Sequence, residues 1–298
     1  MGVKALLASC SFLSLCSLCL AGNPSLESRL APLAKAHKGK VAIAVKHLDS
    51  GAGYYLNADT PMPTASLIKL AVMIEVYQQA AAGKVKLTDR VTLHDADKVR
   101  GSGILTPHFS DGATFSLRDA VRLMIVFSDN TATNLVLDRI GIAATGKRMT
   151  TWGFPNTRIH AKSFRADTTS IDPERSRVFG LGSTTARETI GLLEKLHAGK
   201  AANAEATNAM LDHLKQCDDK EKLTRLLPEG TVVAHKTGSV LKARTDAGII
   251  YLKSGPVAVC VLTAENDDTR WSADNAGNFL CAKVGKVVFD YFAAKTNK

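Results

Sequence analysis

The chain has 298 residues, of which 45% are hydrophobic and 22% are charged, and it carries no low-complexity tract and no internal repeat. This is the composition of a globular protein with a large core, and the length suits one large domain or two interleaved subdomains. The net charge of +10 is spread along the chain, so we expect no nucleic-acid partner. A mild attraction to anionic cell-wall polymer and a generic soluble surface remain alternatives.

Residues 1–22 predict a secretory signal peptide. Lys4 precedes an apolar run, and small residues surround Ala21 and Gly22. A membrane anchor is the alternative, but the run is short for a span and polar sequence follows at once. A lipoprotein signal at Cys10 is less favoured, since the apolar segment before it is shorter still. We therefore expect a periplasmic or secreted protein without a stable membrane anchor.

Three cysteines would remain after cleavage, namely Cys217, Cys260 and Cys281. At most one disulfide can form among them, so the fold must depend on its hydrophobic core. Cys260 lies in the apolar run VAVCVL, which is typical of core packing. Cysteines this far apart do not form a zinc site, and we expect neither a metal nor another cofactor.

The first elements are two strands and a buried helix. Residues 40–51 and 52–59 have strand patterns joined by a glycine-containing turn. From Ala65 to Ala82 the sequence is apolar nearly all round, which predicts a helix inside the protein, with Thr64 as its N-cap. Ser66 would lie in the first turn of this helix and Lys69 one turn later.

Helices dominate the middle of the chain. After the loop RGSGILTPH (100–108), the capping-box pair Ser116 and Asp119 begins an amphipathic helix that runs to Phe127, and a second helix follows from residue 131 to Gly141. Residues 160–183 show no sustained period, as in functional or disordered loops. Residues 183–200 predict another helix, with a second capping box formed by Thr185 and Glu188.

Strand patterns return near the C-terminus in TVVAHKTGS, DAGIIYLK and PVAVCVLT, and a last helix spans residues 278–294. Strands at both ends with helices between them predict an α/β (α+β) fold, in which an antiparallel sheet is flanked by helices and carries an inserted all-helical subdomain. We assign residues 23–63 and 212–298 to the sheet subdomain and residues 64–211 to the helical one, and we expect a monomer.

Ser66 and Lys69 could form a nucleophile and its base. A hydroxyl at a helix N-terminus lies near the positive end of the dipole, and a lysine at i+3 is on the same face. Burial would lower the pKa of the Lys69 ammonium, so the amine could accept the serine proton. The alternative is a lysine that reaches solvent from the helix end. A second Ser-x-x-Lys, Ser239 with Lys242, has no buried helix behind it and is a poor nucleophile candidate.

Two further motifs are ambiguous alone, since Ser128-Asp129-Asn130 could be a helix cap and Lys236-Thr237-Gly238-Ser239 the start of a hairpin. Together and in this order, Ser-x-x-Lys, Ser-Asp-Asn and Lys-Thr-Gly resemble the motif set of class A β-lactamases and penicillin-binding proteins, across roughly residues 24 to 296.

The resemblance implies a role for each motif residue. Ser66 would be acylated, Lys69 would be its base or proton relay, and Ser128 would carry a proton to the leaving nitrogen. Asn130 would contact the substrate amide, and Lys236 and Thr237 would bind its carboxylate. The backbone N–H groups of Ser66 and Ser239 would bind the oxyanion. Arg244 could be a second carboxylate anchor or a solvated charge at a strand end.

One part of the family pattern is missing. The lactamases carry a Glu-x-x-x-Asn in the long loop, whose glutamate activates the water that hydrolyses the acyl-enzyme, and the ungapped count places Thr169 there instead. Asp172-Pro173-Glu174 resembles the lactamase pattern if the loop is shortened, so Glu174 or Asp172 could serve, or both could be exposed loop charges.

Three functions remain possible. The first is an exported class A-type hydrolase that opens the β-lactam amide. The second is a D-Ala-D-Ala carboxypeptidase acting on peptidoglycan peptide with slow deacylation, and the third is a β-lactam sensor domain without turnover.

Overall fold

The computed structural model of the protein describes residues 25–294. The expected signal peptide (residues 1–22) and Cys10 within it lie outside the described residues. None of the helices within residues 25–294 is both long and apolar enough to cross a membrane.

A five-stranded antiparallel sheet forms the centre of the fold, in the order β2-β1-β10-β9-β8. Its first two strands come from the start of the described chain and the other three from its end: β1 (Lys40–His47), β2 (Gly53–Leu56), β8 (Val233–Val240), β9 (Ala243–Leu252) and β10 (Gly255–Ala264). Strands distant in sequence are therefore neighbours, as the sequence predicted.

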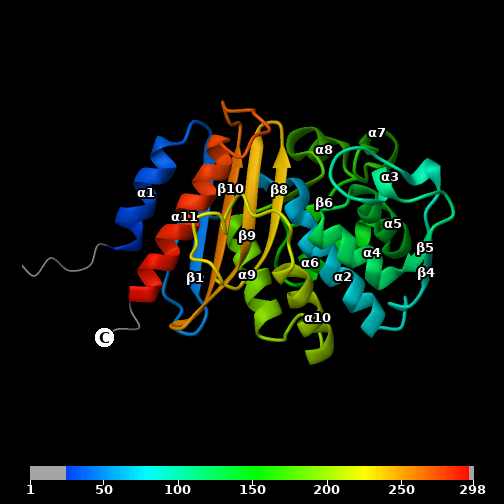
Figure 1. Ribbon diagram of the computed structural model, residues 1–298, viewed down its shortest axis with the longest axis horizontal. Helices are drawn as coiled ribbons and strands as arrows, with labels where there is room; N and C mark the ends of the chain where they lie inside the picture. Colours follow the sequence, from blue (N-terminus) through cyan, green and yellow to red (C-terminus); the bar gives the residue numbers. More distant parts are fainter. Residues whose placement is uncertain (1–24, 295–298) are drawn as a thin grey trace, which may run out of the picture.

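Helices cover both faces of the sheet. On one face, α1 (Leu26–Ala36) and α11 (Ala276–Ala293) lie side by side (Figure 1). Val41, Ile43 and Val45 of β1 pack in that core, whereas Ala42 and Ala44 belong to the core on the opposite face, which α9 (Ala186–His197) shares. Burial on both faces explains why the central strands are almost continuously apolar.

The helical part lies beyond edge strand β8 (Figure 1). Its centre is α2 (Lys69–Ala81), whose residues from Leu70 to Tyr77 are all buried. The surrounding helices are α3 (Leu105–His108), α4 (Leu117–Val126), α5 (Asn130–Ile140), α6 (Ile142–Thr151) and α10 (Ala204–Lys215). Two small sheets, β3 (Met62–Pro63) with β7 (Gly182–Thr184) and β6 (Arg158–Ile159), and β4 (Arg90–Thr92) with β5 (Thr114–Ser116), join this part together. The predicted fold class is confirmed.

Three local predictions need correction. The helix expected from Ala65 begins as a 3₁₀ turn, η1 (Ala65–Ile68), and becomes α-helical only at Lys69. Thr64 occupies the N-cap position, but its side chain makes no capping hydrogen bond. The aperiodic segment 160–183 contains two short helices, α7 (Ala166–Thr169) and α8 (Pro173–Phe179). A further 3₁₀ turn, η2 (Asp95–Asp97), precedes the 100–108 loop.

Candidate active site

The turn that carries Ser66 is held against strands β8 and β9. Ala65, immediately before Ser66, has a left-handed φ of 47°, a strained conformation for a residue with a side chain. The carbonyl of Thr64 accepts a hydrogen bond from Thr245 Oγ1 at 2.9 Å. A Cβ at Gly238 would lie only 2.4 Å from that same carbonyl. Only glycine lets the strand approach this closely, which explains the third residue of the Lys-Thr-Gly motif.

Lys69 is completely buried and points into the site. Its Nζ donates to the Ser128 carbonyl at 2.7 Å, to Asn130 Oδ1 at 2.9 Å and to Ser128 Oγ at 3.3 Å. Burial lowers the pKa of this amine well below its ordinary value, the positive charge of Lys236 lowers it further, and Asp129 opposes the shift. The alternative of a solvent-reaching lysine is therefore wrong. An amine with so low a pKa can accept a proton.

The Ser128-Asp129-Asn130 turn is both a helix cap and part of the site. Asp129 caps α5 by accepting from the Ala132 N–H at 2.8 Å. Its other oxygen accepts from the Ile104 and Leu105 N–H groups at 2.7 and 2.8 Å, which fixes the 100–108 loop. Ser128 has a left-handed φ of 53°. The cap therefore holds Ser128 in a strained conformation, with its hydroxyl between two lysines.

Lys236 completes this arrangement from β8. Its Nζ donates to Ser128 Oγ at 3.1 Å and to the Thr237 carbonyl at 2.9 Å. Burial lowers the pKa of the ammonium, and Cys217 and Asp219 oppose that shift. Ser128 Oγ therefore lies within hydrogen-bonding distance of Lys69 and Lys236 together, which provides a path for a proton between the base and the edge of the site.

A cavity of about 440 Å³ opens at these residues. It is lined by seven of the motif residues expected in the site: Ser66, Ser128, Asn130, Lys236, Thr237, Gly238 and Ser239. This volume lies in the usual range for small-molecule sites. The sequence did not point to several other lining residues, namely Lys162, Phe164, Cys217, Asp219 and Trp271. Phe164 and Trp271 belong to aperiodic segments and are 55% and 70% exposed. A large aromatic residue in such a segment was the sequence signal that could have indicated a binding site.

The guanidinium of Arg244, a possible carboxylate anchor, has backbone carbonyls as its partners in this structure. Its guanidinium is buried and donates to the carbonyls of Ala243 at 3.0 Å and Arg270 at 2.6 Å, and also to the carbonyl of Val240. The charge also packs 4.8 Å from the ring centroid of Trp271. Arg244 does not line the main cavity. It joins the β8–β9 turn to the segment after β10, and it is not a solvated strand-end charge.

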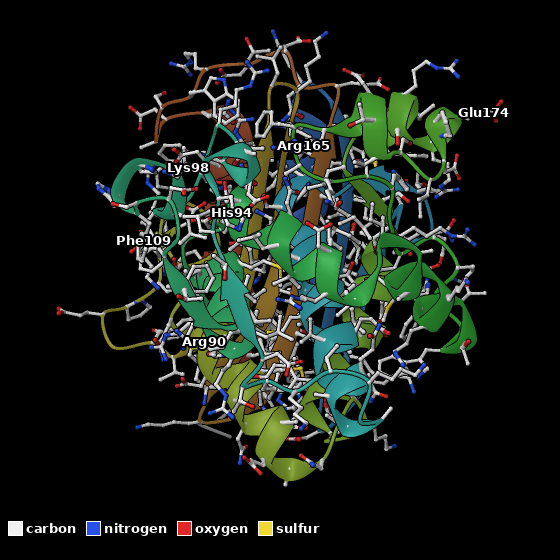
Figure 2. All side chains as sticks on the ribbon, turned by 90° about the vertical axis from the view of Figure 1, so that its right-hand side faces the viewer. Arg90, His94, Lys98, Phe109, Arg165 and Glu174 are labelled. Carbon is white, nitrogen blue, oxygen red and sulfur yellow. The ribbon has the colours of Figure 1, made fainter. Side chains whose placement is uncertain are left out.

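Glu174 and Asp172, the two candidates for activating water, lie outside the cavity. Glu174 is exposed in the first turn of α8, and Figure 2 shows it at the outer edge of the molecule. Asp172 caps the same helix by accepting from the Arg175 N–H at 3.0 Å. Neither residue lines the cavity, because α8 carries both away from it. The parts of the loop that do reach the cavity lie on either side of α8 and contribute Ala161, Lys162, Ser163, Phe164, Ala166, Gly180 and Leu181.

Comparison with known proteins agrees with this geometry. A sequence model described as the beta-lactamase enzyme family matches residues 25–292. The extended-spectrum beta-lactamase PER-1 of Pseudomonas aeruginosa is 26% identical over 285 residues, covering 91% of this chain and 88% of its own length. The crystal structure of a beta-lactamase from Sphaerobacter thermophilus is 30% identical, with a TM-score of 0.79 over 90% of this chain and 98% of its own.

A beta-lactamase from Chitinophaga pinensis has a TM-score of 0.81 over 89% of this chain and 98% of its own, and at 22% identity it shows the fold alone. The family model covers nearly the whole described chain, and the three motifs of the family meet at one cavity. The chain therefore belongs to the beta-lactamase enzyme family.

Proposed function

We propose that this protein is a serine hydrolase that β-lactams acylate on Ser66 and that opens the β-lactam amide. The observation that carries the proposal is the position of Ser128 Oγ, 3.3 Å from the Nζ of Lys69 and 3.1 Å from that of Lys236, at the cavity that Ser66 lines. The beta-lactamases of Pseudomonas aeruginosa and Sphaerobacter thermophilus named above support a β-lactam as the substrate.

Acylation would use the residues in a fixed order. Ser66 Oγ attacks the carbonyl carbon of the β-lactam while Lys69 takes the hydroxyl proton. The backbone N–H groups of Ser66 and Ser239 stabilise the oxyanion. The C–N bond then breaks, and Ser128 passes a proton to the ring nitrogen. Lys236 and Thr237 hold the substrate carboxylate, and Asn130 contacts the substrate amide.

Deacylation would be the slow step. Among the lining residues in the described chain the carboxylates are Asp218 and Asp219. Burial opposes ionisation of Asp219, but Lys222, whose Nζ is 2.5 Å away, outweighs it and lowers the pKa of Asp219 to about 2. So weak a base activates water poorly, and Asp218 is exposed to solvent, so we infer that Lys69 is the base for hydrolysis of the acyl-enzyme.

This lack of a basic carboxylate favours a second function, that of a D-Ala-D-Ala carboxypeptidase whose natural substrate is peptidoglycan peptide and whose penicillin adduct persists. Either activity fits an exported monomer, periplasmic or secreted, with a small-molecule or peptide substrate and no stable membrane anchor.

Time-resolved mass spectrometry with benzylpenicillin tests the proposal. We expect an adduct on the Ser66 peptide that forms quickly and decays slowly, with hydrolysed penicillin accumulating at the rate of decay. The Ser66→Ala variant is the control and should form no adduct. An adduct that never decays, together with release of D-alanine from a D-Ala-D-Ala peptide, would favour the carboxypeptidase. No adduct on Ser66 in the folded protein would refute the assignment of the nucleophile.

A further inference from the structure

A second nucleophilic group lies in the wall of the active-site cavity. Cys217 is on the segment between α10 and β8 and lines the cavity together with Lys236. The backbone of this segment is fixed, because the Asp218 N–H donates to the Val126 carbonyl at 3.0 Å. Cys217 is only 1% exposed, so we expect reagents of a few atoms to reach it through the cavity and bulky ones to be excluded.

Behind this thiol is a buried histidine held by a carboxylate. His235 is completely buried, and its Nδ1 is 3.0 and 3.2 Å from the two oxygens of Asp246. Asp246 is itself fixed by the Leu223 N–H at 3.0 Å. Within residues 25–294, His235 Nε2 has no hydrogen-bond partner. The nearby Cys217 thiol interacts electrostatically with the ring, so Cys217, His235 and Asp246 form a chain of thiol, imidazole and carboxylate.

The electrostatics of this chain favour the thiolate. Burial lowers the pKa of His235, but Asp246 and Cys217 outweigh it and raise that pKa to about 10, so the ring is an imidazolium at neutral pH. Burial raises the pKa of Cys217, but His235 and then Lys236 outweigh it and bring that pKa below its ordinary value. Such an environment activates cysteines towards oxidants. The other two described cysteines, Cys260 and Cys281, are buried thiols whose pKa is raised, mainly by burial.

We propose that Cys217 is a redox modification site, at which a small hydroperoxide that enters the cavity oxidises the thiolate to a sulfenic acid and thereby slows acylation of Ser66. The thiolate sulfur attacks one oxygen of the peroxide, the O–O bond breaks, and the other oxygen leaves as hydroxide, which takes a proton to become water. The sulfenic acid is neutral and carries an extra oxygen. It therefore changes both the charge beside Lys236 and the shape of the cavity where the substrate carboxylate would bind.

The first experiment measures oxidation alone. The full-length protein is treated with hydrogen peroxide at neutral pH for increasing times, and the peroxide is removed with catalase. The protein is then unfolded in the presence of dimedone, which traps the sulfenic acid, and peptide mapping follows each cysteine separately. We expect the Cys217 peptide to be labelled at least about tenfold faster than the Cys260 and Cys281 peptides. In His235→Gln this advantage should fall to less than about threefold while Cys260 stays protected, which shows that the core is intact. Equal labelling of Cys217 and Cys260 in the unsubstituted protein would overturn the proposal.

The second experiment measures the consequence and depends on the proposed function. After peroxide treatment we expect acylation of Ser66 by benzylpenicillin to slow by about tenfold, and a reducing thiol should restore it. Each variant is compared with its own untreated rate, and Cys217→Ser should lose less than about twofold. Equal inhibition of Cys217→Ser would overturn the regulatory part. If the untreated protein forms no adduct, the proposed function fails, and the labelling experiment still decides the reactivity of Cys217.

Discussion

At the scale of single residues, the site contains a lysine whose neutral form is favoured by folding. Lys69 is enclosed by Ser128 and Asn130, and burial together with the charge of Lys236 lowers its pKa. In the proposed mechanism the neutral amine accepts the Ser66 proton, so the reactive fraction grows as the pH rises through the pKa of Lys69.

The acylation rate should therefore fall towards acid pH. Below the pKa of Lys69 we expect the rate constant for adduct formation to drop about tenfold for each pH unit, because the free amine becomes rarer by that factor. Stopped-flow measurements with a chromogenic cephalosporin between pH 5 and 9 check this, with circular dichroism at each pH as the control for folding. A rate that increases as the pH is lowered, in protein that stays folded, would show that Lys69 is not the base.

Arg244 illustrates the opposite case, a charged residue near the site that has a structural task. Arg244→Ala removes a buried guanidinium that donates to the carbonyls of Val240, Ala243 and Arg270. We expect the free energy of unfolding to fall by about 2 to 3 kcal/mol, since hydrogen bonds of charged groups are strong and the side chain also packs. Urea unfolding measures this.

The control for Arg244 is Arg187→Ala, which breaks an exposed ion pair with Asp59 and should change stability little. An Arg244→Ala variant of unchanged stability whose KM alone rises would restore Arg244 to the role of carboxylate anchor.

At the scale of elements, sequence patterns predicted the helix ends well wherever the interacting residues are close neighbours in the sequence. The capping box of Ser116 and Asp119 is present as expected, because both partners belong to one helical turn. The second predicted box is only half formed. Thr185 accepts from the Glu188 N–H at 3.1 Å, but the Glu188 carboxylate accepts hydrogen bonds from Thr157 and Asn156 instead. A tertiary partner 31 residues away competes for that carboxylate, and no local pattern reveals it.

The loop from residue 160 to 183 could not be resolved from sequence for the same reason. Its fixed point is Asn134 on α5, which donates to the Ser163 carbonyl at 3.0 Å and accepts from the Ser163 N–H at 2.8 Å. This contact brings Phe164 to the cavity, after which the short helix α8 carries Glu174 outwards. The sequence suggested Glu174 because its residue type matches the glutamate of the family pattern. The path of the loop depends instead on the side-chain amide of Asn134, which is distant in the sequence.

Substitutions in this loop should therefore differ sharply in effect. Glu174→Gln should leave the rate of adduct decay within about twofold of the unsubstituted protein, because the carboxylate points into solvent far from the acyl group. Phe164→Ala, ten residues earlier, should raise KM several-fold because the ring lines the cavity. Steady-state kinetics and mass spectrometry of the adduct measure both. A large loss of adduct decay in Glu174→Gln would show that the loop closes over the site during turnover.

At the scale of the whole molecule, the active site is a junction between the sheet and the helical part. Ser66 and Lys69 come from the helical part, whereas Lys236 and Gly238 come from edge strand β8. At Gly238 the backbones of the two parts approach each other with no side chain between them. The hydrogen bond from Thr245 to Thr64 also joins the two parts there. The order of strands and helices was predictable from sequence, but this close approach of backbone to backbone was not.

The substitution Gly238→Ala tests how much the activity depends on this junction. A Cβ there would lie 2.4 Å from the Thr64 carbonyl and 2.9 Å from the Leu67 nitrogen, both backbone atoms of the nucleophile turn. The turn and the strand must separate, and a displacement of about 1 Å at a reacting group can lower the rate about a hundredfold. We expect acylation of Ser66 to slow to that degree while far-ultraviolet circular dichroism stays unchanged.

Gly146→Ala is the matched control, since a Cβ at that helical position would meet only the Arg158 side chain, at 3.6 and 3.9 Å. It should keep full activity and raise the free energy of unfolding by up to about 1 kcal/mol, because alanine favours the helix. If Gly238→Ala acylates as fast as Gly146→Ala, the sheet does not set the position of Ser66, and the nucleophile turn must be held by the helical part alone.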